Sequence, residues 1–200
     1  KMIPSFLPYI DEPNKIYIIG SRSSGKSSLF RLLFKQPYLD KIQPSVNGIT
    51  KSVLNMNGKI FTVKDLTDSG DYKITKIFYN EIEDVICIIA VFSIIDHDSF
   101  DKAKSLLTYA QSNITNNVDI QMILCANKYD LIGEKNQGVP LEEVDEFVKT
   151  IHNCKFFLIS CKTGLNVNEV VNAINELEVS PADDTNEERD RTNKNSCFVF

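Results

Sequence analysis

Gly20-Ser21-Arg22-Ser23-Ser24-Gly25-Lys26-Ser27 matches the pattern G-x-x-x-x-G-K-[ST] without a mismatch. The apolar run 16–19 before it predicts a buried strand, and the apolar residues of 28–34 after it recur at helical spacing. A strand, this loop and a helix, in that order, form the setting in which the pattern binds a nucleotide phosphate. The alternative, an ordinary Gly/Ser turn before a helix, is disfavoured because both flanking segments fit.

The residue types of this loop suit a bound anion. Gly20 and Gly25 permit backbone dihedrals and close approaches that a side chain would obstruct. The loop can then turn its N–H groups inward, and the N-terminus of the helix adds partial positive charge. Lys26 is expected to reach the terminal phosphates, and the Ser27 hydroxyl is expected to coordinate Mg²⁺. The predicted phosphate contacts are Ser23, Ser24, Gly25, Lys26, Ser27 and Ser28.

The composition bounds the possible classes of function. Two hundred residues suit one domain that can bury a substantial core. The net charge is −5, the pI is about 5.1 and no basic stripe is visible, which argues against nucleic acid as the main partner. We find neither an apolar run long enough for a membrane span nor the pattern of a secretory signal. The five cysteines form no C-x-x-C pair, which favours free thiols in a reducing compartment and disfavours zinc.

Strand-like and helical segments alternate along the chain. This alternation predicts an α/β fold of the P-loop NTPase class, with a six-stranded, mostly parallel sheet and about five helices. Asn57-Gly58 is a strong two-residue hairpin signal and adds one antiparallel edge strand. Asp98 is predicted to cap the helix over 100–111. The predicted strands are 16–19, 51–56, 59–65, 85–92, 120–126 and 155–159, and the other predicted helices are 28–34, a segment around 74–78, 141–152 and 167–177.

Two polar clusters follow predicted strands, where the ligands of such a sheet gather. Asn127-Lys128-Tyr129-Asp130 follows the strand over 120–126, and Ser160-Cys161-Lys162-Thr163-Gly164 follows the strand over 155–159. With the loop at 20–27, these clusters resemble the Ras superfamily of small GTPases, most closely its Rab branch. N-K-x-D matches fully, S-C-K matches the family's S-A-K with cysteine for alanine, and residues 163–167 continue it as T-G-x-N-V. The resemblance covers residues 16–177.

The resemblance implies a guanine nucleotide, GTP or GDP, as the ligand, with Mg²⁺. Asp130 can accept two hydrogen bonds, from the N1–H and the N2 amine of guanine, whereas adenine offers no such pair of donors. A site built in this way discriminates between bases by about 10⁴–10⁵-fold. Taken alone, the N-K-x-D cluster is explained equally well by a solvated turn.

The family's other base contacts carry over by position. Asn127 is expected to brace the loops around the base, and the stem of Lys128 to cover one face of it. The Cys161 backbone N–H, between Ser160 and Lys162, is expected to donate to guanine O6. Tyr38, twelve residues after Lys26, lies where the family has an aromatic ring that stacks on guanine.

The switch segments depart from the family pattern. Ser45 stands where the family has a threonine that binds Mg²⁺ and senses the γ-phosphate, and Thr50 is the alternative. The family's second switch reads D-x-x-G-Q. An alignment without gaps on Gly70 places Thr67 where the aspartate belongs, leaves Asp65 and Asp68 out of register, and places Asp71 where the glutamine belongs. Lys26, Gly70 and Asp71 are therefore the implied catalytic residues.

These departures predict slow hydrolysis. Glutamine both donates and accepts and so holds the attacking water, whereas a carboxylate only accepts and adds negative charge. We expect Arg22 to obstruct an arginine finger or to lie in solvent, in preference to placing its own cation near the phosphates. Two alternatives stay open: a guanine-nucleotide-binding scaffold with little or no hydrolysis, and, less favoured, another P-loop enzyme such as a nucleotide kinase.

The predicted domain organisation has three parts. Residues 1–13 contain three prolines and predict an irregular extension. Residues 14–178 are the predicted small GTPase domain. Residues 179–200 are polar and predict a disordered tail, which ends in Cys197-Phe198-Val199-Phe200.

This terminal C-a-a-X arrangement predicts geranylgeranylation of Cys197, with a chance match as the alternative. One prenyl chain without a polybasic segment binds membranes reversibly. The resemblance then implies cycling between the cytoplasmic face of membranes and the cytosol, a GDI-like carrier, exchange factors, effectors and a role in vesicle traffic.

Overall fold

The computed structural model describes residues 14–40, 49–66, 85–113, 119–133 and 138–179. The predicted N-terminal extension, the tail with Cys197, Ser45 and the second-switch residues Gly70 and Asp71 lie outside these ranges, as does the helical segment predicted around 74–78. The strands are β1 (Lys15–Ile19), β2 (Ile49–Met56), β3 (Lys59–Leu66), β4 (Val85–Ser93), β5 (Gln121–Asn127) and β6 (Cys154–Leu158). The helices are α1 (Lys26–Leu33), α3 (His97–Asn113), α4 (Leu141–Val148) and α5 (Val167–Asn175), with a 3₁₀ turn at Tyr129–Leu131.

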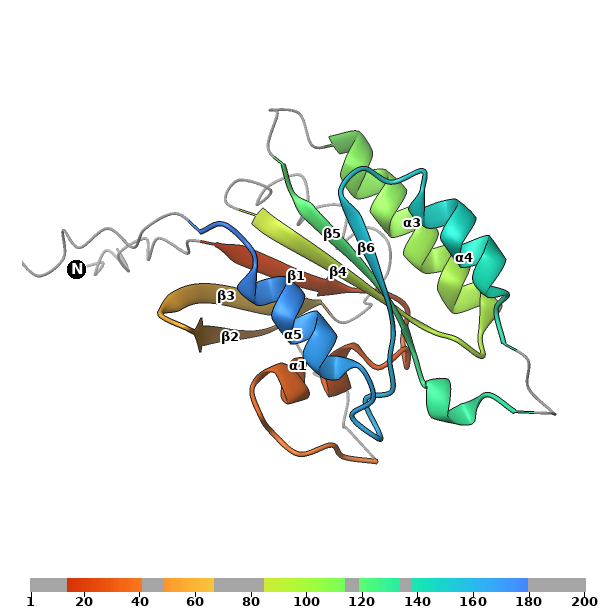
Figure 1. Ribbon diagram of the computed structural model, residues 1–200, viewed down its shortest axis with the longest axis horizontal. Coiled ribbons are helices and arrows are strands. Elements are labelled where there is room, and N and C mark those ends of the chain that lie inside the picture. The colour runs from red at the N-terminus through yellow and green to blue at the C-terminus, as the bar shows by residue number, and fades with distance from the viewer. Residues whose placement is uncertain (1–13, 41–48, 67–84, 114–118, 134–137, 180–200) are drawn as a thin grey trace, which may run out of the picture.

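The six strands form one sheet in the order β2-β3-β1-β4-β5-β6 (Figure 1). β2 pairs antiparallel with β3, and all the other neighbours are parallel. The six-stranded, mostly parallel α/β sheet predicted from the sequence is therefore confirmed, including its single antiparallel edge. Four α-helices lie in the described residues, against about five expected for the whole chain.

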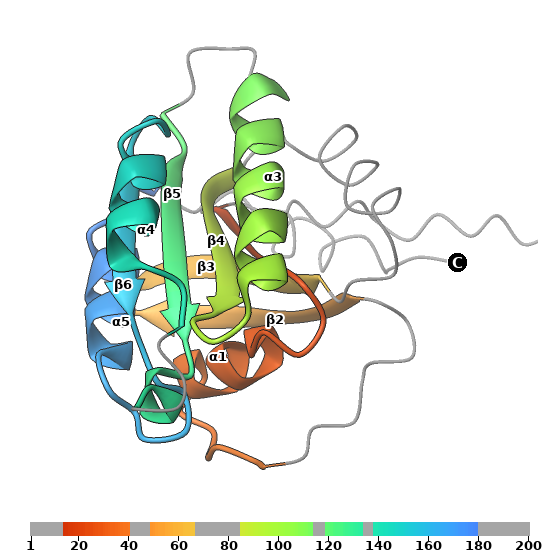
Figure 2. The same ribbon diagram turned by 90° about the vertical axis from the view of Figure 1, so that its right-hand side faces the viewer.

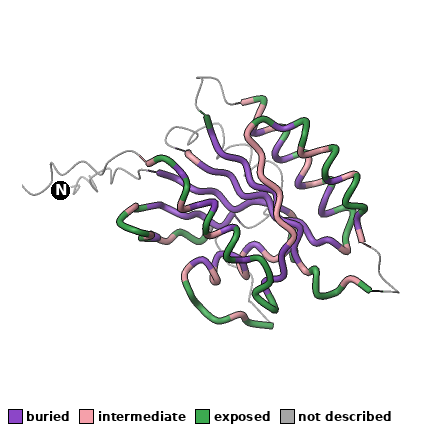
Figure 3. The backbone as a smooth tube through the Cα atoms, viewed as in Figure 1, coloured by how far each residue is buried: buried purple, intermediate pink, exposed green. Residues whose placement is uncertain are grey.

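Each face of the sheet is covered by one pair of helices, α1 with α5 and α3 with α4 (Figure 2). Side chains alternate along a strand, so neighbouring residues of β4 enter different cores. Cys87, Ile89 and Val91 pack in the cluster of α1 and α5, whereas Ile88 and Phe92 pack in the cluster of α3 and α4. Figure 3 shows the central strands buried along their length. Burial on both faces explains why these strands are almost continuously apolar in sequence.

The hairpin between β2 and β3 adopts the turn that its sequence predicts. Asn57 and Gly58 have φ of 54° and 80°, the left-handed values that a type I′ turn requires. The Lys59 ammonium after the turn donates to the carbonyl oxygens of Asn175 and Leu177, at 2.7 Å each. These carbonyls lie at the C-terminal end of α5, where the last turn of a helix lacks internal donors. The tip of the edge hairpin thus caps the final helix.

Two predicted helix boundaries are wrong. α3 begins at His97, and its capping residue is Asp96, whose Oδ1 accepts the Ser99 N–H at 3.2 Å; Asp98, the predicted cap, lies in the first turn. α4 ends at Val148 and does not continue to residue 152. The backbone after it closes tighter bonds, from Thr150 N–H to the Phe147 carbonyl at 2.9 Å and from Ile151 N–H to the Val148 carbonyl at 3.1 Å. Bonds of this i→i−3 type end an α-helix and turn the chain toward β6.

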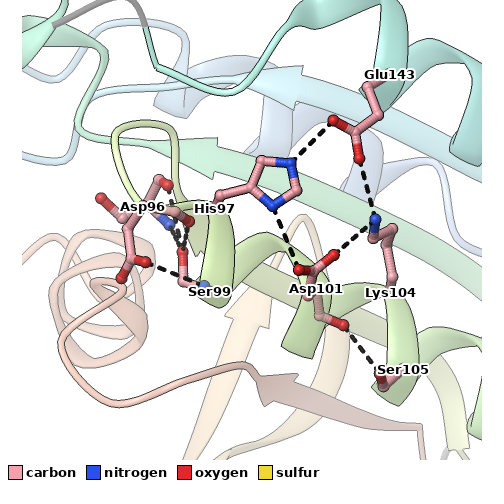
Figure 4. A network of polar contacts seen from close by, with 8 residues as sticks. Asp96, His97, Ser99, Asp101, Lys104, Ser105 and Glu143 are labelled. Atoms are coloured by element: carbon pink, nitrogen blue, oxygen red, sulfur yellow. Dashed lines mark hydrogen bonds and ion pairs between the residues drawn. The ribbon is translucent and has the colours of Figure 1, made fainter.

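A network of charged side chains joins the start of α3 to the start of α4 (Figure 4). His97 Nε2 lies 3.0 Å from Glu143 Oε2, and His97 Nδ1 lies 3.3 Å from Asp101 Oδ2. Lys104 Nζ lies 2.7 Å from Asp101 and 3.1 Å from Glu143, and 4.5 Å from the centre of the Phe100 ring. An imidazole donates through both nitrogens only when it is protonated. The hydrogen bonds to Glu143 first, and to Asp101 second, therefore raise the pKa of His97 above its ordinary value.

The two acidic residues at the start of α3 give a matched test of the cap. Asp96→Ala is expected to lower the free energy of unfolding by about 1 kcal/mol, because the Ser99 N–H loses its acceptor. Asp98→Ala removes the same charge without removing a cap and is expected to cost only about a few tenths of a kcal/mol. Urea unfolding of both variants measures the difference, and equal losses would show that Asp96 is not the cap.

The stability from the His97 contacts is expected to depend on pH. Because the folded-state pKa of His97 is raised, the contribution is complete below the unfolded pKa and is lost as the pH rises through the folded pKa. Unfolding midpoints of the wild type and His97→Gln, compared between about pH 5.5 and 8.5, should therefore converge as the pH increases. The groups are exposed, so added salt should reduce the difference. A difference that widens with pH would contradict this assignment.

Candidate nucleotide-binding site

The predicted phosphate loop joins the end of β1 to the start of α1, and its two glycines are held in conformations that favour glycine. Gly20 has φ of 139° and Gly25 has φ of 105°. A side chain on Gly20 would collide with the Val91 carbonyl, and one on Gly25 would collide with the amide of Asn127. The first glycine therefore allows the loop to lie against β4, and the second allows it to lie against Asn127.

Lys26 places its ammonium group against this loop. Its side chain is buried, and its ammonium donates to the Ser21 carbonyl oxygen at 2.8 Å. Since α1 has no acidic residue in its first turn, the helix start stays positive toward the loop. Arg22 follows Ser21 in this loop and is exposed to solvent. Solvent exposure is one of the two positions expected for it, the other being obstruction of an arginine finger. The loop therefore has the charge and shape that suit a phosphate.

Ser27 contacts Asp65, the carboxylate that the alignment on Gly70 left out of register. Its hydroxyl donates to Asp65 Oδ2 at 2.6 Å. Asp65 is 1% exposed, and its Oδ1 is buried without a hydrogen-bond partner in the described residues. Burial, which outweighs the Ser27 hydrogen bond and the charge of Lys26, raises the pKa of Asp65. The aspartate beside the predicted metal ligand is therefore Asp65, and the assignment of Thr67 to that place is wrong.

The physical reason is strand register. β3 pairs with β1 so that Asp65 lies opposite Ile18, two residues before the phosphate loop. Counting back from Gly70 crosses residues 67–69, which lie outside the described ranges. The sequence did contain the signal, an acidic residue at the end of the apolar strand predicted over 59–65.

These oxygen groups fit Mg²⁺, which prefers hard oxygen ligands and keeps several waters beside one or two protein ligands. Ser27 would supply a hydroxyl, and the unpartnered Asp65 Oδ1 would supply a carboxylate oxygen, for the ion or its water. In the described ranges, no group of three His, Cys, Asp or Glu side chains could hold a metal ion. Of the two expected first-switch ligands, Ser45 lies outside the described residues, and Thr50 pairs with Asp65 between β2 and β3.

Asn127 connects the two halves of the site. Its Nδ2 donates to the Ser24 carbonyl of the phosphate loop at 2.9 Å, and its Oδ1 accepts the Cys161 N–H at 3.0 Å. The side chain is 3% exposed. Asn127 therefore braces the loops, as the sequence predicted. The same bond shows that the Cys161 N–H, expected to donate to guanine O6, is engaged by Asn127 in this structure.

Ser160 orients Asp130, a role that the sequence analysis missed. Its hydroxyl donates to Asp130 Oδ1 at 2.6 Å and accepts the Thr163 N–H at 3.2 Å. Asp130 is exposed, and its second oxygen has no hydrogen bond among the described residues. Lys128 adopts a left-handed conformation with φ of 68°, which turns the chain out of β5 into the 3₁₀ turn that carries Asp130. The carboxylate is thus held from one side and open on the other.

The Cys161 side chain takes no part in this polar network. It is 2% exposed and lies in the core cluster of α1 and α5. Burial first, and the charge of Asp130 second, raise the pKa of its thiol to about 12. A neutral, buried thiol behaves as a small apolar group, which explains how cysteine replaces the family's alanine. Cys87, Cys125 and Cys154 are likewise free thiols.

The other residues predicted to contact the base lie at the same end of the molecule. Tyr38 is half-buried and packs against the cluster of α1 and α5. Its segment, residues 35–40, lies beside the loop 160–166 that contains the exposed Lys162, in both Figure 1 and Figure 2. The structure thus brings the phosphate loop, Asp65, Asn127, Asp130 and the loop after β6 together at the carboxyl ends of the parallel strands.

Comparison with known proteins agrees with this geometry. The model of the Ras family matches residues 15–178. The chain is 27% identical over 180 residues to the GTP-binding protein Rhes of Homo sapiens, covering 84% of this chain and 67% of the relative. It is 29% identical to the Ras-related protein Rab-2B of Dictyostelium discoideum, over 78% of this chain and 75% of the relative, and 25% identical to the small monomeric GTPase RhbA of Aspergillus fumigatus, over 87% and 92%. With a family model that spans most of its length, this chain belongs to the Ras family of small GTP-binding proteins.

Proposed function

We propose that this protein is a GTP/GDP switch of the Rab type that binds guanine nucleotide with Mg²⁺, hydrolyses GTP slowly and acts in vesicle traffic. The observation that carries the proposal is the Asn127 bridge, which fixes the phosphate loop relative to the loop after β6. A ligand that contacts both must have phosphate at one end and a group for Asp130 at the other. A guanine nucleotide meets both requirements.

The pair Ser27 and Asp65 supports a dependence on Mg²⁺. Magnesium would neutralise phosphate charge and orient the phosphate oxygens. Ser27 and Asp65 would hold the ion, while Lys26 holds the phosphate from within the loop. Because the buried carboxylate is in place, we expect the ion to slow nucleotide release.

Slow hydrolysis is proposed from Asp71 and Arg22. A carboxylate at residue 71 cannot donate to the transferring phosphoryl group and adds charge beside it. Arg22 is exposed at the loop, where a bulky side chain would meet a cation inserted by a regulatory partner. The same two residues favour one alternative, a guanine-nucleotide-binding scaffold with little or no hydrolysis. Partner binding compared with GDP and with a non-hydrolysable GTP analogue separates the two, since only a switch distinguishes the nucleotides.

The Rab-type role rests on the resemblance and on the tail. One relative bears the name Ras-related protein Rab-2B, and Cys197 stands in a C-a-a-X arrangement. Within the described ranges, no helix is long and apolar enough to cross a membrane. A prenyl group on Cys197 would give reversible attachment to the cytoplasmic face of membranes, with a GDI-like carrier in the cytosol and exchange factors and effectors as further partners.

Base selection is tested by titrating the protein with GTP, GDP, ATP and XTP, with and without Mg²⁺. The wild type is expected to prefer GTP and GDP over ATP by about 10⁴-fold or more. Asp130→Asn exchanges one acceptor for a donor and should move the preference toward XTP, whose base has a second carbonyl where guanine has an amine. Asp130→Ala is the control, because it removes both acceptors without adding a donor. Equal affinity of the wild type for ATP and GTP would refute the proposal.

Hydrolysis is tested by single-turnover assays on protein loaded with GTP. Asp71→Gln is expected to increase the rate by about tenfold or more, because it restores a group that donates and accepts. Asp71→Asn removes the charge with a shorter side chain and should increase it less. Fast hydrolysis in the wild type that Asp71→Ala abolishes would contradict the assignment.

A further inference from the structure

Arg31, in the last turn of α1, holds the segment that presents Tyr38. Its Nε and Nη2 both donate to the carbonyl oxygen of Pro37, at 3.2 Å each. This carbonyl belongs to the peptide group that continues into the N–H of Tyr38. Because a peptide group is planar, holding the Pro37 oxygen also restricts the position of the Tyr38 nitrogen and Cα. Arg31 therefore acts on the backbone from which the Tyr38 side chain projects.

The end of α1 supports the same segment from the other side. The Gln36 N–H donates to the Arg31 carbonyl, and the Lys35 N–H donates to the Leu32 carbonyl, at 2.9 Å each. Lys35 has φ of 55°. These two bonds and the left-handed residue form a Schellman motif, which closes the helix and reverses the chain. Arg31 thus contacts the exit segment twice, through its own carbonyl and through its guanidinium.

The residues that follow this motif have little conformational freedom. Pro37 has a fixed φ and restricts the residue before it. Tyr38 and Phe34 both pack against the core cluster of α1 and α5, and the rings of Phe30 and Phe34 are 4.7 Å apart. With the Pro37 carbonyl held, the position of Tyr38 is set before any ligand binds.

We propose that Arg31 is a positioning residue for nucleotide binding, which holds Tyr38 ready as the aromatic platform for the base. The inference rests on the proposed function, because it requires a purine nucleotide beside Tyr38. Its physical basis is preorganisation: a ring that is already placed does not pay the entropy of ordering when it stacks. An effect of this kind lies mainly in the rate of release.

A double-mutant cycle tests this role with the full chain. The variants are Arg31→Ala, Tyr38→Ala and both together, and the measurement is the release rate of a fluorescent GDP. Arg31→Ala is expected to release GDP about three- to tenfold faster, as the loss of one anchoring contact predicts. Tyr38→Ala is expected to release it about ten- to a hundredfold faster, through the loss of stacking. In the Tyr38→Ala background, Arg31→Ala should add less than about twofold.

Lys149→Ala is the control. It removes an exposed cation at the end of α4, on the opposite face of the sheet, and should leave the release rate unchanged. Arg31→Lys retains the cation with a single donor group and should lie between the wild type and Arg31→Ala. It also serves as the test variant if Arg31→Ala does not fold, which thermal unfolding of each variant checks.

The outcomes separate this inference from the proposed function. If the wild type binds GDP and Arg31→Ala has no effect, or accelerates release equally with and without Tyr38, Arg31 does not position Tyr38 and the inference is overturned alone. If the wild type binds neither GDP nor GTP, the proposed function and the inference are both overturned.

Discussion

The relative position of the two halves of the site depends on one buried amide. Asn127 donates to the phosphate loop and accepts from the loop after β6, and no side chain that only donates or only accepts could do both. The contact also explains Gly25, since a side chain there would occupy the space of the Asn127 amide. One residue at the end of β5 thereby holds two other loops and constrains the sequence of one of them. Replacing it would leave buried polar groups of both loops without partners, which is costly.

Much of the fold could be predicted because its signals are local and repeated. A few consecutive residues are enough to recognise each of three features: the apolar strands buried on both faces, the Asn57-Gly58 turn and the phosphate loop. The errors in the site arose where a contact between distant segments decided the outcome, whereas the two wrong helix boundaries depend on local capping and i→i−3 bonds. The alignment on Gly70 missed Asp65, because strand register, and not the spacing from Gly70, places this residue beside Ser27. The roles of Ser160 and of the Cys161 N–H depend on residues more than 25 positions away along the chain.

The residues proposed for binding and those proposed for hydrolysis differ in how far they follow the family pattern. The groups proposed for phosphate, base and metal, namely Lys26, Asp130, Ser27 and Asp65, lie on the sheet and the loops at its edge. The departures from the pattern are Arg22 in the phosphate loop and Asp71 outside the described residues, and we propose that they affect the attacking water and the approach of a partner. A chain can therefore keep a complete nucleotide site while its rate of turnover changes. Such a protein would stay in its GTP state for as long as regulators allow.

The cap that Lys59 places on α5 has a mechanical consequence. The ammonium of Lys59 joins the last carbonyls of this helix end to the edge hairpin. A pull on the chain beyond α5 would therefore be shared between the helix and the hairpin. Such a load would enter the sheet through β3, the strand that also carries Asp65, so a force at the end of α5 and an ion held beside Ser27 would act on the same strand.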